Sequence, residues 1–234
     1  MVQMAAGPFT VGHILIYDAC GNAVDGGPVP SGGGGGGGTG LPIPYPEAVP
    51  PGLVSSWEWV SQGTASAADF SGGIALTAPN LAGTSWRVLK KQAPASPPYS
   101  ITAAYLLQRR SAGFTRSGIV LRESATGRLE TWGMSNDSSR SHDHWSSLTS
   151  WASGDSPINA AGVPVLFLRV RNDGSNLIYS TSAIGREGSF ITMVSHPLRA
   201  FFASGPDELG FGIDNEGNGG DVVMYLFHWD VKVG

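Results

Sequence analysis

The strongest structural signal in this sequence is the stretch Val165-Leu166-Phe167-Leu168-Arg169-Val170-Arg171, followed by Asn172-Asp173-Gly174-Ser175 and by Leu177-Ile178-Tyr179-Ser180-Thr181. The two flanking runs are rich in aliphatic, aromatic and β-branched residues, which favour strands. The Asp173-Gly174 pair supplies the positive φ angles that a tight turn between antiparallel strands requires. The stretch therefore predicts a β-hairpin.

The same kind of signal returns on both sides of this hairpin. Further predicted strands are Tyr99–Leu107, Ser117–Glu123, Leu129–Trp132, Leu209–Asp214 and Val222–Val233, with a second hairpin turn at Ala125-Thr126-Gly127-Arg128. No amphipathic helix longer than two turns is predicted. Short strands separated by clusters of Gly, Asn and Asp are typical of an antiparallel two-sheet β-sandwich, so the sequence predicts an all-β fold.

The last predicted strand also gives an expectation about its buried face. Its apolar and aromatic residues Val223, Tyr225, Phe227, Trp229, Val231 and Val233 recur with a period of two, which predicts that they share one face of a sheet. Trp86 and Trp229 are expected to fill the core of the sandwich, because tryptophan buries a large apolar area.

Composition excludes several classes of protein. The 234 residues carry a formal net charge of −4, and 14% of them are charged, well below the roughly 25% of ordinary soluble domains. Only three residues are lysine, and no basic cluster suited to nucleic acid is present. The one cysteine, Cys20, allows neither an intrachain disulfide nor a cysteine-based zinc cluster. No apolar run is long enough to span a bilayer, so no membrane insertion is expected.

Composition also divides the chain into three parts. Residues 1–30 contain one alternating run, His13-Ile14-Leu15-Ile16-Tyr17, which predicts a short β-strand anchor, and a turn at Cys20-Gly21-Asn22. Residues 31–52 hold seven consecutive glycines, Gly32 to Gly38, and then five prolines, which predicts a tether without a core. Residues 53–234 are expected to form the sandwich. The first residues have no basic or apolar signal-peptide region, so synthesis in a cytoplasm without a secretion signal is expected.

The segment 8–28 resembles a known short element of phage virions. It contains Gly12-His13, Asp18, Gly21-Asn22, Asp25 and Gly27, in the spacing G-H-x-x-x-x-D-x-x-G-N-x-x-D-x-G that occurs in phage tail fibres and related virion proteins. The resemblance implies a segment that attaches to the virion and trimerises. The residues it assigns to attachment or oligomerisation are Phe9, His13, Ile14, Ile16 and Tyr17.

The larger part of the chain, 53–234, resembles the concanavalin A-like lectin/glucanase jelly roll. The likeness is carried, in order, by Pro97–Ala103, Gly118–Ser124, Asn172-Asp173-Gly174, Leu209–Asp214 and the ending Leu226–Val231. These are positions that carry a fold, so the resemblance implies the architecture more strongly than it implies an activity.

A polar stretch between the predicted strands contains possible metal ligands. Asp137, His142, Asp143 and His144 could bind a transition metal or calcium. The alternative is a solvated loop, which serine-rich segments of mixed charge usually form. We favour the loop and predict no metal and no other cofactor.

Aromatic residues near this stretch are candidates for contact with a carbohydrate. Trp145 and Trp151 are flanked by serine and are the better candidates for exposure, and Trp132 lies close by in sequence. Together with Asn136 and Asp137 they form the predicted carbohydrate-binding set, because loop aromatics on a rigid scaffold are common binding devices. The alternative is that these tryptophans fill the core.

Glu123 and Glu130 raise the alternative of catalysis. If Thr126 and Gly127 form the turn, the two glutamates face each other across the hairpin at about 5 Å, which is the carboxylate spacing of a retaining glycosidase. The neighbouring arginines would serve equally well as surface partners. The acidic triplet E-x-D-x-x-E of glucanases with this fold is missing, so we predict no catalytic residues and a protein that is not an enzyme.

These observations support one leading hypothesis and two alternatives. The leading one is a virion-attached fibre or spike protein, a homotrimer bound to other virion proteins, that displays a lectin-like domain to a host-surface glycan. The first alternative is a structural decoration protein of the head or tail. The second is a virion-associated polysaccharide hydrolase.

Overall fold

The computed structural model describes residues 13–17, 23–28, 48–109, 114–135, 139–159, 167–217 and 220–234. The chain forms two compact units, Met1–Ile43 and Pro44–Gly234. In the first unit, β1 (His13–Tyr17) pairs with β2 (Ala23–Pro28) in antiparallel register. The predicted strand at 13–17 is confirmed, and it carries His13, Ile14, Ile16 and Tyr17. Phe9 and the turn at 20–22 lie outside the described residues.

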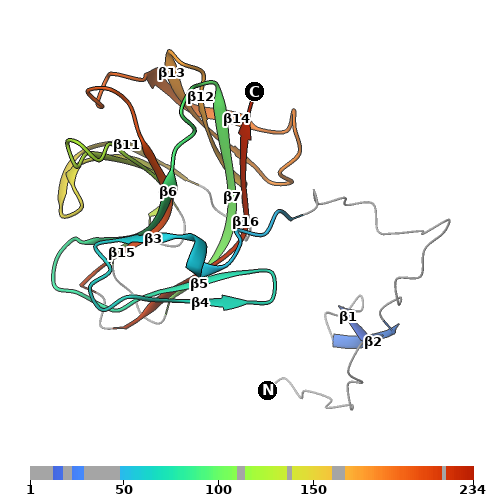
Figure 1. The fold of residues 1–234 in the computed structure, drawn as a ribbon. Helices are drawn as coiled ribbons and strands as arrows, with labels where there is room; N and C mark the ends of the chain where they lie inside the picture. The colour runs from blue at the N-terminus through green and yellow to red at the C-terminus, as the bar shows by residue number, and fades with distance from the viewer. Residues whose placement is uncertain are drawn as a thin grey trace. The chain divides into compact units, whose positions relative to one another are not determined.

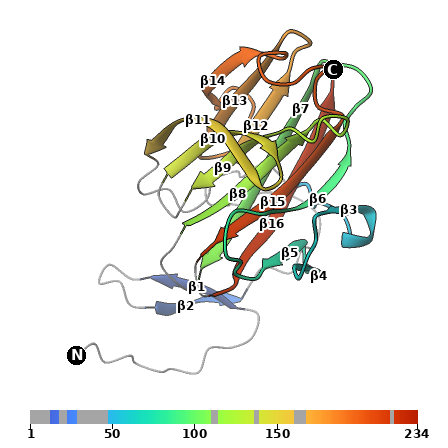
Figure 2. The ribbon, with the colours of Figure 1, turned by 90° about the vertical axis from the view of Figure 1, so that its left-hand side faces the viewer.

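The second unit is a sandwich of two seven-stranded sheets (Figures 1 and 2). The first sheet has the order β11 (Ser150–Asn159), β10 (Ser139–Ser147), β9 (Leu129–Ser135), β8 (Phe114–Arg122), β15 (Glu208–Glu216), β6 (Trp86–Gln92) and β3 (Glu58–Val60). The second has the order β14 (Ile191–Pro197), β13 (Asn176–Ser182), β12 (Phe167–Asn172), β7 (Tyr99–Arg109), β16 (Val222–Val233), β5 (Gly73–Ala78) and β4 (Ser66–Phe70). Every pairing between these strands is antiparallel, so the predicted all-β sandwich is confirmed.

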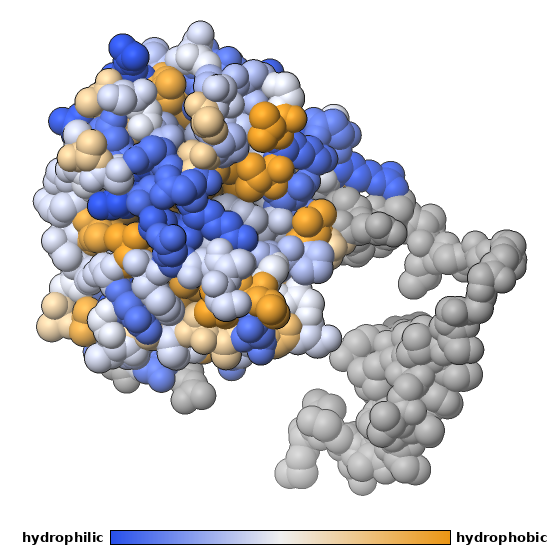
Figure 3. Space-filling model, viewed as in Figure 1, coloured by the Kyte–Doolittle hydropathy of each residue, from blue (hydrophilic) through white to orange (hydrophobic). Residues whose placement is uncertain are grey.

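Helical structure is almost absent from the described part of the chain. It amounts to one 3-10 turn, η1 (Val54–Ser56). Accordingly, none of the described segments is a helix long and apolar enough to cross a membrane. On the face drawn in Figure 3, hydrophobic residues form several separate patches among hydrophilic ones.

The predicted hairpin around Asp173-Gly174 forms, and of its residues Val165 and Leu166 lie outside the described part of the chain. β12 and β13 pair up to Asn172 and Leu177, and Gly174 takes a φ of +94° in the turn between them. The side chain of Asp173 accepts hydrogen bonds from the backbone N–H groups of Ser175 and Asn176 at 2.9 and 2.7 Å. The turn is therefore stabilised by the aspartate and the glycine that predicted it.

The core lies between the two sheets and has an aromatic centre. Trp57 packs edge-to-face against Phe211 and Trp229, with ring centroids 4.9 and 5.2 Å apart. Edge-to-face pairs add about 1 kcal/mol each beyond the area they bury. The prediction that Trp229 is a core residue is confirmed. Trp86 is also buried, but it belongs to a second cluster with Val88, Val120, Leu129 and Trp145 on the other face of the first sheet.

The predicted buried face of β16 is wrong along most of the strand. Val222, Met224 and Leu226 are buried, whereas Val223 and Tyr225 of the predicted face are only partly buried. The pairing with β7 shifts between Leu226 and His228, which is a β-bulge. One extra residue reverses the alternation, so Trp229 faces the core although Val223 does not.

Three neighbouring strands approach one another closely through glycine. Gly118 of β8 pairs with Gly133 of β9 on one side and with Gly212 of β15 on the other. A Cβ atom added to Gly133 would lie 1.8 Å from the carbonyl oxygen of Ser117 and 2.6 Å from the Cα of Gly118. Because both neighbours are backbone atoms, no side-chain rotation can relieve the contact.

The variant Gly133→Ala should therefore separate β8 from β9. We expect it to lower the free energy of unfolding by about 3 kcal/mol and the melting temperature by about 10 °C, measured by circular dichroism. Gly217→Asn is the control, because a Cβ there meets nothing within 4 Å and asparagine tolerates its φ of +67°. Equal melting temperatures for the Gly133→Ala variant and the wild type would contradict the close approach.

Candidate functional site

Three histidines and a glutamate gather on the inner face of the sandwich. β9 supplies Glu130, β10 supplies His142 and His144, and the edge strand β14 of the other sheet supplies His196. In the register of β9 with β10, His144 lies opposite Glu130 and His142 lies opposite Trp132. Alternation along each strand turns Glu130, His142 and His144 toward the same side of the first sheet, and His196 reaches them from the second sheet.

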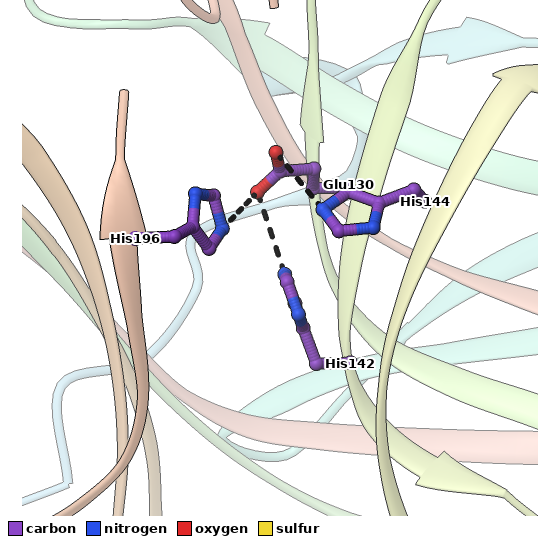
Figure 4. A group of neighbouring side chains, drawn as sticks. All are labelled: Glu130, His142, His144 and His196. Carbon is purple, nitrogen blue, oxygen red and sulfur yellow. Dashed lines mark hydrogen bonds and ion pairs between the residues drawn. The ribbon is translucent and has the colours of Figure 1, made fainter. Parts of the chain in front are cut away.

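The imidazoles point at the two oxygens of the carboxylate (Figure 4). The Nε2 atoms of His142 and His196 lie 3.4 and 3.3 Å from Glu130 Oε2, and Nε2 of His144 lies 3.5 Å from Oε1. The hydroxyl of Tyr179, on β13, donates a hydrogen bond to Oε2. One donor atom from each of the four residues lies within 4.8 Å of all the others.

The cluster is buried at its base and reachable at its rim. The side chains of Glu130 and His142 are fully buried, whereas those of His144 and His196 are 17% and 16% exposed. A pocket of about 290 Å³ opens beside them, lined by His144, Ser153, Val194, Ser195, His196, Ala200 and Phe201. Solvent therefore reaches the two outer imidazoles.

The carboxylate is held in its charged form despite its burial. Burial alone raises the pKa of Glu130, but the hydrogen bonds from His142, His144, His196 and Tyr179 outweigh it and hold that pKa well below its usual value. The site thus holds a buried negative charge faced by three imidazoles. Such a set of donors can share protons or bind a cation.

The polar stretch predicted to be a loop is mostly a strand. Ser139–Ser147 forms β10, so the loop prediction is wrong for His142, Asp143 and His144. Asp143 points to the opposite face from the two histidines, which separates it from them. Asn136 and Asp137 lie outside the described residues. The His-x-His spacing places both histidines on one face of a strand, and this is the feature of the sequence that indicates β10.

The three candidate tryptophans have different environments. Trp132 and Trp145 are completely buried, so the expectation that Trp145 is exposed is wrong, and neither ring offers a face to a ligand. The indole N–H of Trp132 donates across the sandwich to the carbonyl of Ser180, and Trp145 packs edge-to-face on Trp86. Trp151 is 53% exposed, as expected.

Trp151 lies beside a charged cluster on the outer face of the first sheet. Its indole N–H lies 3.3 Å from Asp143 Oδ1, and the guanidinium Nε of Arg116 lies 3.7 Å from Asp143 Oδ2. Arg116 also contacts Asp214 at 3.2 Å and lies over the rings of Phe114 and Trp145. The exposed ring of Trp151 is therefore held by the Asp143 carboxylate, which is itself held by the guanidinium of Arg116.

The predicted pairing of Glu123 with Glu130 is wrong. Glu130 lies opposite Leu121, and Glu123 lies in the turn, where its backbone pairs with Arg128 and Gly127. The Glu123 carboxylate accepts hydrogen bonds from the hydroxyl of Thr126 and from the N–H groups of Ala203, Ser204 and Gly205. Glu123 therefore anchors the segment after β14, and the pair of carboxylates that motivated the hydrolase alternative does not form.

Comparison with known proteins relates the sandwich to others by structure. No protein-family model and no curated protein matches the sequence. A functionally unknown protein from Saccharomyces cerevisiae matches 78% of this chain and 99% of its own, with a TM-score of 0.56 and 14% identity. A legume lectin-like domain from Entamoeba histolytica matches 77% of this chain and 91% of its own, with a TM-score of 0.50 and 10% identity. The fold is lectin-like. Identities this low concern the fold alone, and on that point the jelly roll implied by the sequence is confirmed.

The anchoring role of Glu123 predicts a pH dependence of stability. Burial raises its pKa, but the hydrogen bonds from Thr126 and the three N–H groups outweigh burial and leave the pKa below its usual value. Because the folded pKa is depressed, the contribution of Glu123 is complete above the unfolded pKa of about 4.3 and is lost as the pH falls through the folded value. We expect Glu123→Gln to lower the free energy of unfolding by about 2 kcal/mol at pH 7.

This difference from the wild type should stay constant between about pH 5 and 8 and shrink below about pH 4, as measured by urea unfolding at each pH. Glu187→Gln is the control, because the Glu187 side chain is 78% exposed. If Glu123→Gln lowers the free energy of unfolding by the same amount at pH 3 and pH 7, the prediction is wrong, and the packing of the Glu123 side chain rather than its charge anchors the segment.

Proposed function

We propose that the Pro44–Gly234 unit is a carbohydrate-binding domain and that it binds its ligand at the surface around Trp151. The observation that carries the proposal is an exposed tryptophan ring, held by Asp143, on a lectin-like sandwich. An exposed aromatic face can stack on the apolar face of a sugar ring. Asp143 and Arg116 lie largely buried beneath the ring, so they fix its position, and the exposed ring itself is the surface offered to a sugar.

Pre-organisation supports this surface over other exposed residues. The indole N–H of Trp151 is occupied by Asp143, which limits rotation of the ring before a ligand arrives. A side chain that is already ordered loses less conformational entropy on binding. Trp151 thus differs from Leu53 and Ile191, which are more exposed but aliphatic.

We further propose that this domain is displayed on a virion and binds a host-surface glycan. The support is the resemblance of residues 8–28 to the phage tail-fibre element, followed by the glycine- and proline-rich stretch 31–52. A homotrimer attached to other virion proteins would present several weak sites at once. Such linkage raises avidity by about 10²–10⁴ without new contacts at any one site.

The variant Trp151→Ala tests the carbohydrate proposal. A glycan that binds the wild-type protein on an array should bind this variant at least tenfold more weakly by titration calorimetry, because about 1.5 kcal/mol of ring contact is lost. The affinity of Trp151→Phe for the glycan should lie between those of the wild type and Trp151→Ala, since phenylalanine keeps a ring but cannot donate a hydrogen bond to Asp143. Phe70→Ala is the control, because Phe70 is a partly exposed aromatic on the other sheet. An array without any hit, or equal affinities for Trp151→Ala and the wild type, would contradict the proposal.

The display proposal predicts the oligomeric state. The full chain should show a mass three times the 24.3 kDa of one chain in multi-angle light scattering, whereas residues 53–234 alone should be monomeric. A monomeric full chain would argue against trimerisation by the N-terminal segment. The carbohydrate proposal does not depend on this result.

A further inference from the structure

We propose that Glu130, His142, His144 and His196 form a binding site for a divalent first-row transition metal, with Zn²⁺ as the ion used to test it. Three imidazole nitrogens and one carboxylate oxygen are ligands that zinc accepts in proteins. The inference stands apart from the carbohydrate proposal, because the cluster lies on the inner face of the first sheet and Trp151 is associated with the outer face.

The spacing of the donor atoms suits a single ion. Ligands bound to zinc at about 2.1 Å in a tetrahedron lie about 3.4 Å from one another. The three imidazole Nε2 atoms lie 3.3, 3.4 and 3.5 Å from the carboxylate oxygens of Glu130. One donor atom from each of the four residues lies within 4.8 Å of all the others, so an ion would require only a modest inward movement of the side chains.

Hydrogen bonds at the far side of the rings orient the donor atoms. Nδ1 of His196 lies 3.1 Å from the carbonyl oxygen of Pro197, and because a carbonyl only accepts, this nitrogen carries a proton. In the neutral ring, the lone pair is then on Nε2, the atom that faces Glu130. Nδ1 of His144 lies 3.1 Å from the hydroxyl of Ser153. Metal-binding histidines are held in this way by a partner at the second nitrogen.

A nitrogen lone pair facing a carboxylate oxygen is unfavourable unless a positive charge lies between them. That charge is either a proton on the imidazole or a metal ion. Glu130 Oε1 and His144 Nε2 are both buried and lie 3.5 Å apart, at the outer limit of a hydrogen bond, so each is only weakly satisfied by the other. A metal ion would satisfy these two atoms together and give the buried carboxylate a counter-charge without protonating the imidazoles.

The place of the cluster indicates what a bound ion would do. Its ligands come from two neighbouring strands of one sheet and from the edge strand of the other, so the ion would link the two sheets. His144 and His196 also line the 290 Å³ pocket. The pocket therefore reaches the outer side of the two rings, and rotation of one of these partly exposed imidazoles would open a path from it to the buried donor atoms.

The test is a Zn²⁺ titration of the full chain, produced without a histidine tag and treated with chelator, against a chromophoric competitor. We expect one Zn²⁺ per chain. His144→Gln and His196→Gln should each weaken binding at least about 100-fold, and both positions are partly exposed, so the variants should fold. His228→Gln is the control, because His228 accepts a hydrogen bond from Val49 and lies outside the cluster.

Two further measurements keep the result interpretable. Circular dichroism melting checks that each variant is folded, and Zn²⁺ should raise the melting temperature of the wild type but not of His196→Gln. Co²⁺ should give the wild type a visible absorption spectrum of a four- or five-coordinate ion. Absence of stoichiometric binding, or wild-type affinity in both His144→Gln and His196→Gln, would overturn the proposal and assign the positive charge to a protonated imidazole. Trp151→Ala should bind Zn²⁺ normally.

Discussion

Alternation of side chains along β10 divides the chemistry of this sandwich between two faces. His142 and His144 point inward to Glu130, while Asp143, between them, points outward to Trp151 and Arg116. A shift of the strand by one residue would exchange the two sets and place a carboxylate beside Glu130. The candidate metal site and the candidate carbohydrate surface therefore depend on the same register between β9 and β10.

Two buried carboxylates on opposite faces of the first sheet show how their partners determine their charge. Glu130 is faced by three imidazoles and a phenol, which hold its pKa below the usual value although burial opposes this. For Asp214, burial prevails and raises the pKa, although the N–H of Ser85 and the guanidinium of Arg116 work against it. The number of converging donors, more than burial itself, distinguishes the two carboxylates.

Much of the fold could be predicted from the sequence, because hairpins are specified locally. The Asp173-Gly174 turn needs no distant contact to form, and the prediction there was correct. The side chains of β16 change faces at a bulge in its pairing with β7, and the periodicity of a single strand does not reveal such a bulge. The loop prediction fails at β10 because the inward face of this strand is polar, and a strand that lines a site lacks the apolar alternation of an ordinary core strand. The sequence gives no sign of His196, because only the packing of the two sheets against each other brings it to Glu130.

The position of His196 also bears on a general problem of open sheets. β14 is an edge strand with Ile191, Thr192, Ser195 and Pro197 exposed, and one of its sides has no neighbouring strand in the described sheet. Such edges can pair with other chains or separate from their own sheet. The contact from His196 to Glu130 attaches β14 to the opposite sheet through its side chain. Whether a proton or a metal ion supplies the positive charge there, the cluster restrains the edge strand at a point where backbone pairing cannot.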